Sequence, residues 1–428
     1  TGGYEKIAVK TFAKFYSTKP ENFDALLQEE KERLQYLLHT FSKRELPKKE
    51  MIEQLVLSSD AFIVERKSTN SKSIIAGYHW FGDWGRDTLI SLTGLTLVTG
   101  RFNDAKSILK TFASYMKNGL VPNTFPEHGI EPIYNTADAS LLFSLALYDY
   151  YQYTKDISLI RELLPKLEEV VDCYTNGTDF GIGVDSDMLV RLSNPNIQLT
   201  WMDAKIGDRI VTPRNGKPVE INAFWYATLM VLGKFYEILK IQKDVEDKAE
   251  TVKRSFQKFW NSDANYLFDT IDPHDPSIRP NALFALSIPF RLLDEEKEAK
   301  IIEKAYEELY TPYGIRTLSP KDPRYHGSYT GDPVSRDEAY HQGTAWPYLL
   351  RPFITSYCRI RRLTLADAFN KFFIPFEQHL ADAGVGFISE IFDGDSPNPR
   401  GCIAQAWSVA ELLRAYAEIA GLSNEHRG

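Results

Sequence analysis

Asp203 stands in a loop-like segment, QLTWMDAK, where Trp201 and Met202 precede it. Apolar neighbours raise the pKa of a carboxyl group because they disfavour its charged form. A carboxyl that stays protonated near neutral pH is what a general acid requires. Asp208 and Glu220 lie close in the sequence and compete with Asp203 for this role.

A second acidic candidate, Glu390, lies between apolar residues in the segment GVGFISEIFDGD. Asp393 and Asp395 flank a glycine there and are typical of solvated turn residues. The DGD triplet has no acidic closing ligand, so we do not expect a calcium loop. Glu390 is therefore the candidate general base.

A third segment, GYHWFGDWGRD, combines aromatic rings with a charged pair. Trp80 and Trp84 offer flat apolar faces, and Arg86 and Asp87 offer fixed polar groups. This combination suits a sugar ring, which has apolar C–H faces and neighbouring hydroxyls. The alternative is that Asp87 caps the following helix while Arg86 pairs with a nearby carboxylate.

Two further loop segments carry polar residues with weaker signals. Thr136 and Asp138 precede an apolar helix, and we interpret them as N-terminal caps. His341, Gln342 and Trp346 follow in a later segment, AYHQGTAW, where they are candidates for ligand contact. A single histidine beside aromatic rings is as often a structural residue.

The composition excludes several classes of protein. The 428 residues include 43% apolar and 25% charged residues, which is typical of a globular protein with a large core. A net charge of −8, without a long basic run, argues against a nucleic-acid partner. No HExxH, Walker, GxGxxG or GxSxG motif is present, so we expect no metal and no cofactor.

The cysteines and the uncharged stretches bear on the cell compartment. Cys173, Cys358 and Cys402 are far apart in the sequence, so we expect neither disulfides nor a thiolate zinc site, and a cytoplasmic location. The uncharged stretches 88–100 and 221–233 are shorter than the roughly 20 apolar residues of a membrane span. We expect no contact with a membrane, and the oligomeric state is unknown.

Helical spacing of apolar residues predicts an all-α fold with two alternating kinds of helix. Amphipathic helices are expected at about 48–65, 103–118, 156–174, 244–260, 293–308 and 363–379. Helices that are apolar nearly all round are expected at about 87–99, 136–153, 220–240, 280–290, 344–357 and 403–420. One more amphipathic helix is expected at about 21–41, within an N-terminal segment 1–47.

Six buried helices alternating with six half-exposed ones predict an (α/α)6 barrel over 48–428. The links from outer to inner helices are long, and in an alternating ring they all lie at one end. This mouth is the expected site. Two stacked helical domains with a boundary near 175–218 are the alternative.

The quoted segments together resemble the amylo-α-1,6-glucosidase domain of glycogen debranching enzymes. The resemblance spans about 77–412 and includes YHWFGDWGRDTLISLTGL, PNTFPE, YNTADASLLF, LTWMDAKIGD, AYHQGTAWPYL and GFISEIFDGDSPNPRGCIAQAWSVAE. It implies a glucoamylase-like (α/α)6 barrel that hydrolyses α-1,6-linked glucose with inversion. Relatives of prokaryotic type usually carry a β-rich domain before the barrel, and we expect this chain to begin after it.

The resemblance also implies roles for individual residues. The general acid falls on Asp203, the general base on Glu390, and the pair that holds the terminal glucose on Arg86 and Asp87. We expect further substrate contacts from Trp80, Trp84, Trp201, Lys205, His341, Gln342 and Trp346. The expected partners are glycogen or branched α-glucan oligosaccharides.

Three rival functions stay open at this point. One is another α-glucosidase or a trehalase-like specificity on the same barrel. A second is a sugar isomerase or epimerase, which would need paired histidines at the mouth. The third is a glucan-binding domain without catalysis.

Overall fold

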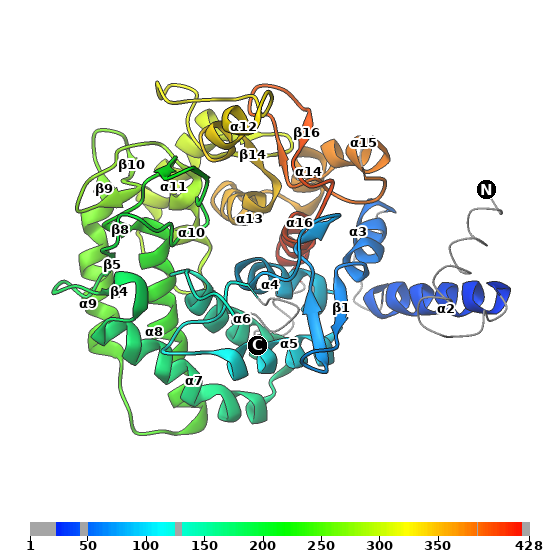
Figure 1. Ribbon diagram of the computed structural model, residues 1–428, viewed down its shortest axis with the longest axis horizontal. Coiled ribbons are helices and arrows are strands. Elements are labelled where there is room, and N and C mark those ends of the chain that lie inside the picture. Colours follow the sequence, from blue (N-terminus) through cyan, green and yellow to red (C-terminus); the bar gives the residue numbers. More distant parts are fainter. Residues whose placement is uncertain (1–22, 43–49, 125–130, 383, 422–428) are drawn as a thin grey trace.

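The computed structural model describes residues 23–42, 50–124, 131–382 and 384–421, and the fold is mostly helical (Figure 1). The predicted apolar helices all form, and their ends differ from the predicted ones by up to four residues. They are α4 (Gly85–Leu92) with η1 (Thr93–Leu97), α6 (Ala139–Thr154), α8 (Val219–Leu239), η4 (Pro280–Leu283) with α10 (Phe284–Ser287), η5 (Pro347–Leu349) with α13 (Leu350–Arg361), and α16 (Ala406–Ile419). Residues 219–229 of α8 are all buried, as expected of a helix that is apolar on every side.

The predicted amphipathic helices form as well, except that residues 63–65 of the first belong to strand β1 (Ile63–Arg66) and that the last one divides into two helices. They are α3 (Glu50–Asp60), α5 (Phe102–Tyr115), α7 (Ile157–Asn176), α9 (Glu246–Phe256), α11 (Glu295–Glu308), and the pair α14 (Leu365–Phe372) and α15 (Ile374–Asp382). Each buries one stripe of side chains, as in α9, where Ala249, Val252 and Phe256 are buried. The additional helix α2 (Phe23–Ser42) buries only Leu37 and Phe41.

The buried helices contact one another in a closed cycle. Contacts link α4 to α6, α6 to α8, α8 to α10, α10 to α13, α13 to α16, and α16 back to α4. The amphipathic helices lie outside this cycle: α5 contacts α6, α7 and α9 contact α8, α11 contacts α13, and α3 contacts α16. Contacts between α6 and α8 continue across the segment 175–218, where the sequence offered a possible domain boundary.

Short strands and one more helix form in the loops between the predicted helices, most of all in the loop that follows α11. Helix α12 (Pro333–Tyr340) ends that loop, and Asp332 caps it by accepting a hydrogen bond from the Ser335 N–H at 2.8 Å. A five-stranded antiparallel sheet joins the last two long loops: β12 (Tyr310–Thr311), β13 (Gly314–Arg316), β14 (Ala345–Trp346), β15 (Ile391–Phe392) and β16 (Pro399–Arg400).

The remaining strands form two-stranded antiparallel pairs. They are β1 (Ile63–Arg66) with β2 (Ser71–Ile74), β3 (Gly77–Tyr78) with β17 (Ala404–Gln405), β4 (Ile182–Val184) with β5 (Val190–Leu192), β6 (Lys205–Ile206) with β7 (Arg209–Ile210), β8 (Lys217–Pro218) with β11 (Thr270–Ile271), and β9 (Trp260–Asn261) with β10 (Tyr266–Leu267). The pair β3–β17 joins the loop before α4 to the loop before α16. Short 3-10 turns lie at η2 (Asp179–Gly181) and η3 (Gln257–Phe259).

Candidate active site

Arg86, in the first turn of α4, connects two acidic side chains from different loops. Its Nε donates to Oδ2 of Asp138 at 2.8 Å, and its Nη1 donates to Oδ2 of Asp203 at 3.0 Å. The Arg86 side chain is 5% exposed, whereas that of Asp203 is 42% exposed. The guanidinium group is therefore fixed inside the protein, while the Asp203 carboxylate remains open to solvent.

The cap prediction for Asp138 is wrong for its side chain. Asp138 occupies the N-cap position of α6, but its carboxylate makes no cap hydrogen bond and instead accepts from Arg86. Its Oδ1 is buried and has no hydrogen-bond partner among the described residues. A buried carboxylate favours a charged guanidinium donor over a neutral backbone N–H. Asp138 thus orients Arg86 toward Asp203.

Asp87 follows Arg86 in the first turn of α4 and is 9% exposed. The N-cap position of this helix is Trp84, so Asp87 is not the cap residue. Burial raises the pKa of Asp87 to about 7, the charge of Arg86 opposes this rise, and the charges of Asp203 and Glu390 add to it. The three carboxyl groups therefore belong to one electrostatic site.

Glu390 is held at both carboxylate oxygens. The hydroxyl of Tyr340 donates to Oε1, and the N–H of Cys402 donates to Oε2 at 2.8 Å. Gly401 adopts a positive φ of +65°, and a Cβ there would lie 2.3 Å from Oε2 of Glu390. Glycine at this position is what lets the backbone approach the carboxylate so closely.

The electrostatics of the two candidate catalytic acids differ. The surrounding protein partly desolvates Asp203, whose side chain is 42% exposed, and thereby raises its pKa, whereas the charge and hydrogen bond of Arg86 oppose the rise. Burial also raises the pKa of Glu390, whereas the hydrogen bonds from Tyr340 and Cys402 oppose the rise. The charge of Asp203 raises the pKa of Glu390 further. Glu390 thus has two donors that favour its ionised form, as a general base requires.

The competitors of Asp203 lie in different surroundings. The side chain of Asp208 is fully exposed. Glu220 is buried and its Oε2 accepts from Nη2 of Arg214 at 2.7 Å, so its charge is neutralised inside the protein. Of these three acids, only Asp203 both accepts a hydrogen bond from Arg86 and is accessible to solvent.

The predicted aromatic walls fall into two groups. Trp80 is 64% exposed and Trp84 is half-buried. Trp201 and Trp346 are only 5% and 1% exposed, and their indole N–H groups donate to Asn281 at 2.7 Å and to Thr344 at 3.0 Å. The expected place of Trp346 in the pocket wall stays a prediction, and its ring packs inside the protein. Trp201 packs against it edge to face.

His341 and Gln342 are also interior residues, and their expected contact with ligand stays a prediction. His341 is fully buried, and its Nδ1 accepts from the N–H of Ala204 at 3.4 Å. Burial lowers the pKa of His341 well below its ordinary value, so the ring is neutral. Gln342 accepts from Arg279 at 2.8 Å and donates to the Val211 carbonyl at 3.1 Å.

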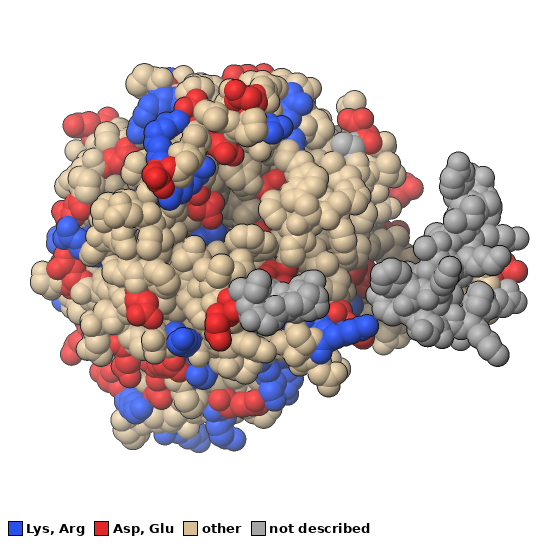
Figure 2. All heavy atoms as spheres, viewed as in Figure 1, with Lys and Arg blue, Asp and Glu red and all other residues tan. Residues whose placement is uncertain are grey.

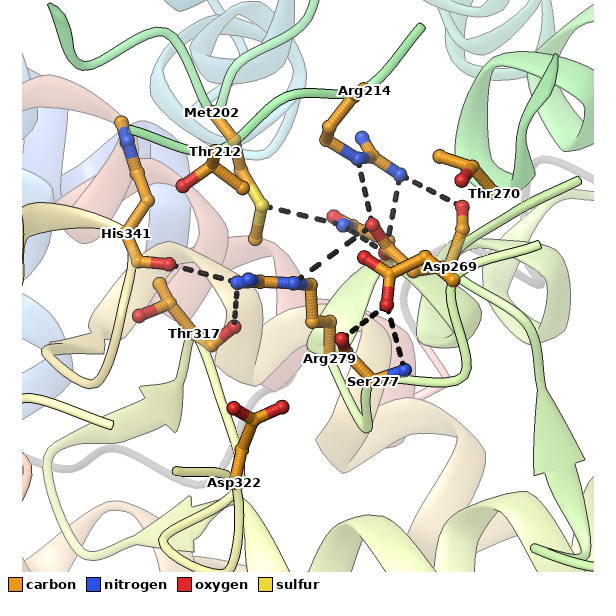
Figure 3. Close-up of polar contacts among 12 residues, drawn as sticks. Met202, Thr212, Arg214, Asp269, Thr270, Ser277, Arg279, Thr317, Asp322 and His341 are labelled. Carbon is orange, nitrogen blue, oxygen red and sulfur yellow. Dashed lines mark hydrogen bonds and ion pairs between the residues drawn. The ribbon is translucent and has the colours of Figure 1, made fainter. Parts of the chain in front are cut away.

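A buried polar network supports the loop that carries Asp203 (Figure 3). Asn281 accepts from the Trp201 indole at 2.7 Å and donates to Asp269 at 2.7 Å. Asp269 also accepts from Arg214 at 2.8 Å, and Arg279 donates to the His341 carbonyl at 2.9 Å. These contacts fix the residue positions on both sides of Asp203. Lys205 lies outside the network, and its exposed Nζ is 3.7 Å from Asp208.

A hollow opens in the face shown in Figure 2, within the ring of helices of Figure 1, and both acidic and basic side chains are visible in it. Residues 125–130, which include Glu127 and His128, lie outside the described residues. Within the described ranges, no group of three or more His, Cys, Asp or Glu side chains has the arrangement of a metal site. No helix of the described part is long and apolar enough to span a membrane, and Cys173, Cys358 and Cys402 are all free.

Sequence comparison identifies the family. Residues 57–414 match the amylo-alpha-1,6-glucosidase family. The chain belongs to this family. The resemblance predicted from the motifs is thereby confirmed. The chain is also 27% identical over 413 residues to the glycogen debranching enzyme of Saccharomyces cerevisiae. The match covers 72% of the chain but only 27% of the yeast enzyme's length.

Solved structures with a similar fold come from Thermus thermophilus. One is a GH63 mannosylglycerate hydrolase in complex with glucose, which has a TM-score of 0.61 and 14% sequence identity. The match covers 85% of the present chain and 99% of the hydrolase chain. Another is an uncharacterized conserved protein, with a TM-score of 0.62, 15% identity, and coverage of 84% and 99%. At these identities the likeness concerns the fold alone.

Sequence reasoning assigned no role to Tyr340, Gly401 or Cys402 and interpreted Asp138 as a cap. Tyr340 stands within the segment AYHQGTAW, but nothing in a single sequence indicates that its hydroxyl meets Glu390. The two residues are 50 positions apart, and only the folded chain brings them together.

Proposed function

We propose that this chain is an inverting amylo-α-1,6-glucosidase, which releases glucose from α-1,6 branch points of glycogen or branched maltooligosaccharides. Membership of the amylo-alpha-1,6-glucosidase family supports the class of reaction. The similarity to the yeast glycogen debranching enzyme supports the substrate. A cytoplasmic location stays a prediction.

We further propose that the helices form an (α/α)6 barrel. The closed cycle of contacts among the buried helices, with the amphipathic helices outside it, supports this arrangement. In such a barrel the long loops gather at one mouth, where Arg86, Asp203 and Glu390 would line one pocket. Residues 48–428, apart from those outside the described ranges, would then make one catalytic domain.

In the proposed mechanism, Asp203 donates its proton to the glycosidic oxygen at C6 of the branch-point glucose while the bond from C1 to that oxygen breaks. Glu390 takes a proton from a water molecule whose oxygen forms the new bond to C1 on the opposite face. The product is β-glucose, and both carboxyl groups return to their starting state by proton exchange with solvent. Inversion needs room for that water, so we expect about 6.5–9.5 Å between the two carboxyl groups.

Arg86 and Asp87 would hold the terminal glucose by hydrogen bonds to its hydroxyls. The guanidinium also neutralises Asp203 after proton donation, which stabilises the developing carboxylate. The observation that carries the proposal is the pairing of an accessible acid, Asp203, with a base, Glu390, whose two oxygens are held by Tyr340 and Cys402.

The test is release of glucose from a glucosyl-branched maltooligosaccharide. We expect Asp203→Asn and Glu390→Gln each to lower kcat by about 10²–10⁴-fold while the circular dichroism spectrum stays unchanged. A matched control is Asp208→Asn, an exposed acid on the same segment, which should keep its turnover. Near-normal rates in either active-site variant would contradict the assignment.

The rival α-glucosidase and trehalase-like functions are separated by substrate. Glucose release from isomaltosyl, maltosyl and trehalose substrates compares the α-1,6 linkage with its alternatives. A glucan-binding domain without catalysis would release no glucose from any of them. The isomerase alternative needs paired histidines, but His341 is buried and neutral, which disfavours it as a proton shuttle.

A further inference from the structure

Two adjoining hollows lie among the buried helices, and no candidate catalytic residue lines either of them. The inner hollow is lined by residues from all six buried helices, including Leu89 of α4, Phe224 of α8 and Glu411 of α16. The outer hollow encloses about 1370 Å³, part of which is open solvent. Arg351 and Arg414 line both hollows, so the two spaces adjoin at these side chains.

The outer hollow lies at the opposite end of the helices from the candidate active site. Arg86 is in the first turn of α4, and Cys402, whose N–H donates to Glu390, shortly precedes α16. Glu418, which lines the outer hollow, lies 12 residues after Ala406, the first residue of α16. Twelve residues of α-helix correspond to roughly 18 Å along the axis. The outer hollow is therefore distinct from the candidate active site.

Four charged side chains at the junction of the hollows pair with one another. The Glu418 carboxylate accepts from Nη2 of Arg351 at 2.7 Å and from Nε of Arg414 at 2.9 Å. Nη2 of Arg414 also lies 2.7 Å from Oδ2 of Asp149. Two further arginines on the rim form ion pairs with acidic residues of α11. The paired charges leave no strong excess of either sign to attract an ion.

Several polar groups of the hollows have no hydrogen-bond partner within the described part of the chain. Glu411 is 5% exposed, and its Oε1 is unpartnered. The hydroxyl of Ser356, which lines the outer hollow and is 1% exposed, is unpartnered as well. The Nη1 groups of Arg351 and Arg414 donate to none of the described residues. Buried polar groups normally find a partner, so a ligand with several polar groups fits here.

The chemistry of these groups favours a neutral ligand that carries hydroxyls. A hydroxyl can accept from a guanidinium and donate to a carboxylate, so vicinal hydroxyls satisfy both kinds of group at once. An anion would lie against the carboxylates of Asp149, Glu411 and Glu418, and a cation would lie against two guanidinium groups. The rings of Phe224 and Phe284 line the inner hollow and suit the C–H groups of a polyol.

We propose that the two hollows together bind a neutral polyol of monosaccharide size, with Glu411, Ser356 and the two arginines as its hydrogen-bonding partners. This second ligand site goes beyond the proposed hydrolysis and does not depend on it. The volume of the inner hollow, about 540 Å³ with part of it open solvent, lies within the range of small-molecule sites.

The test measures access to the hollows with a thiol reagent and uses glucose as the probe ligand. Ser287 is half-buried at the end of α10 and lines both hollows, and Ser287→Cys places a thiol there with little change in size. Glucose at about ten times its Kd should slow modification of this thiol by methyl methanethiosulfonate roughly tenfold, as read by mass spectrometry. Ser114→Cys, on the outer helix α5, is the control and should react at the same rate with and without glucose.

Two variants in the Ser287→Cys background test the partners of the ligand. Glu411→Leu should abolish the protection by glucose, and the smaller change Ser356→Ala should weaken it. Circular dichroism checks that both variants fold. Unchanged protection in both variants, equal slowing of the Ser114→Cys thiol, or a Ser287→Cys thiol that the reagent does not reach would overturn the proposal.

Inorganic phosphate, tested in place of glucose, separates the proposed ligand class from an anion. It should give no protection at the concentration at which glucose protects. Protection by phosphate alone would mean an anion site and would overturn the proposal. If glucose protects the Ser287→Cys thiol but the wild-type chain releases no glucose from branched substrates, the second site stands and the proposed function fails.

Discussion

The hydroxyl of Tyr340 donates a hydrogen bond to Oε1 of Glu390, at the end of a helix that the sequence does not predict. Because the N–H of Cys402 donates to the other oxygen, the carboxylate cannot rotate without losing a partner. The candidate base is therefore held in a single orientation. This fixed geometry makes the role of Tyr340 testable through the pH dependence of catalysis.

Replacement of Tyr340 by Phe should move the acidic limb of the kcat/KM profile to higher pH. The hydrogen bond favours ionised Glu390 and lowers its pKa, so removing the donor raises that pKa. A bond of about 1 kcal/mol corresponds to a shift of roughly 0.7 pH units. Tyr313→Phe, which alters a tyrosine packed on Phe392, is the control. An unshifted acidic limb would show that Tyr340 acts only in packing.

Replacement of Asp138 by Asn should move the basic limb to lower pH. The charge of Asp138 raises the pKa of Asp203, and without it the Arg86 charge acts on Asp203 alone. Asp203 would then lose its proton at lower pH, so the active fraction falls earlier on the alkaline side. The pH profile of kcat/KM measures this directly. A basic limb at higher pH would contradict the proposed link through Arg86.

Replacement of Gly401 by Ala should lower kcat at least hundredfold. A Cβ at this position would lie 2.3 Å from Oε2 of Glu390 and would displace the carboxylate. Gly177→Ala is a matched control, because Gly177 also has a positive φ (+89°) but nothing within 4 Å of the added Cβ. Both variants should lose some unfolding free energy to backbone strain, because L side chains rarely adopt a positive φ. Only Gly401→Ala should lose activity.

The sequence predicted the helices well because their signal is local. An apolar helix such as α8 must be covered on all sides by other elements. The alternation of such helices with amphipathic ones therefore indicates an inner and an outer layer of helices. Asp203 and Glu390 were found as carboxyl groups with apolar neighbours. Their partners were not, since Arg86 and Asp138 are 52 positions apart and Tyr340 and Glu390 are 50 apart.

The tryptophans show the same limit from another side. In the sequence, a tryptophan next to polar loop residues resembles a residue that stacks on a sugar, whether its ring faces solvent or the core. Trp80 and Trp346 are alike in this respect, but one is 64% exposed and the other 1%. Burial depends on which loops pack together, here the strand β14 within the five-stranded sheet. A single sequence does not contain that information.

Replacement of Glu411 by Gln should stabilise the protein at pH 8 more than at pH 4. Glu411 is 5% exposed, and burial raises its pKa to about 7. At pH 4 the carboxyl is largely protonated in both states. As the pH rises above 4.5, the unfolded chain ionises first, so the folded state loses up to about 3 kcal/mol by pH 8. Glutamine, which stays neutral, removes this loss.

Urea unfolding at the two pH values measures the Glu411 effect. Glu296→Gln, at a side chain that is 79% exposed, is the control and should change stability little at either pH. A gain from Glu411→Gln that is the same at pH 4 and pH 8 would mean that ionisation of this carboxyl does not govern the stability.

The most direct test of an inverting site built from Asp203 and Glu390 is proton NMR of the glucose first released from a glucosyl-branched maltooligosaccharide. Single displacement at an α linkage gives β-glucose, which then converts slowly to the equilibrium mixture. We expect the β anomeric signal to appear first. Initial release of α-glucose would indicate a retaining mechanism and would contradict the roles assigned to both residues.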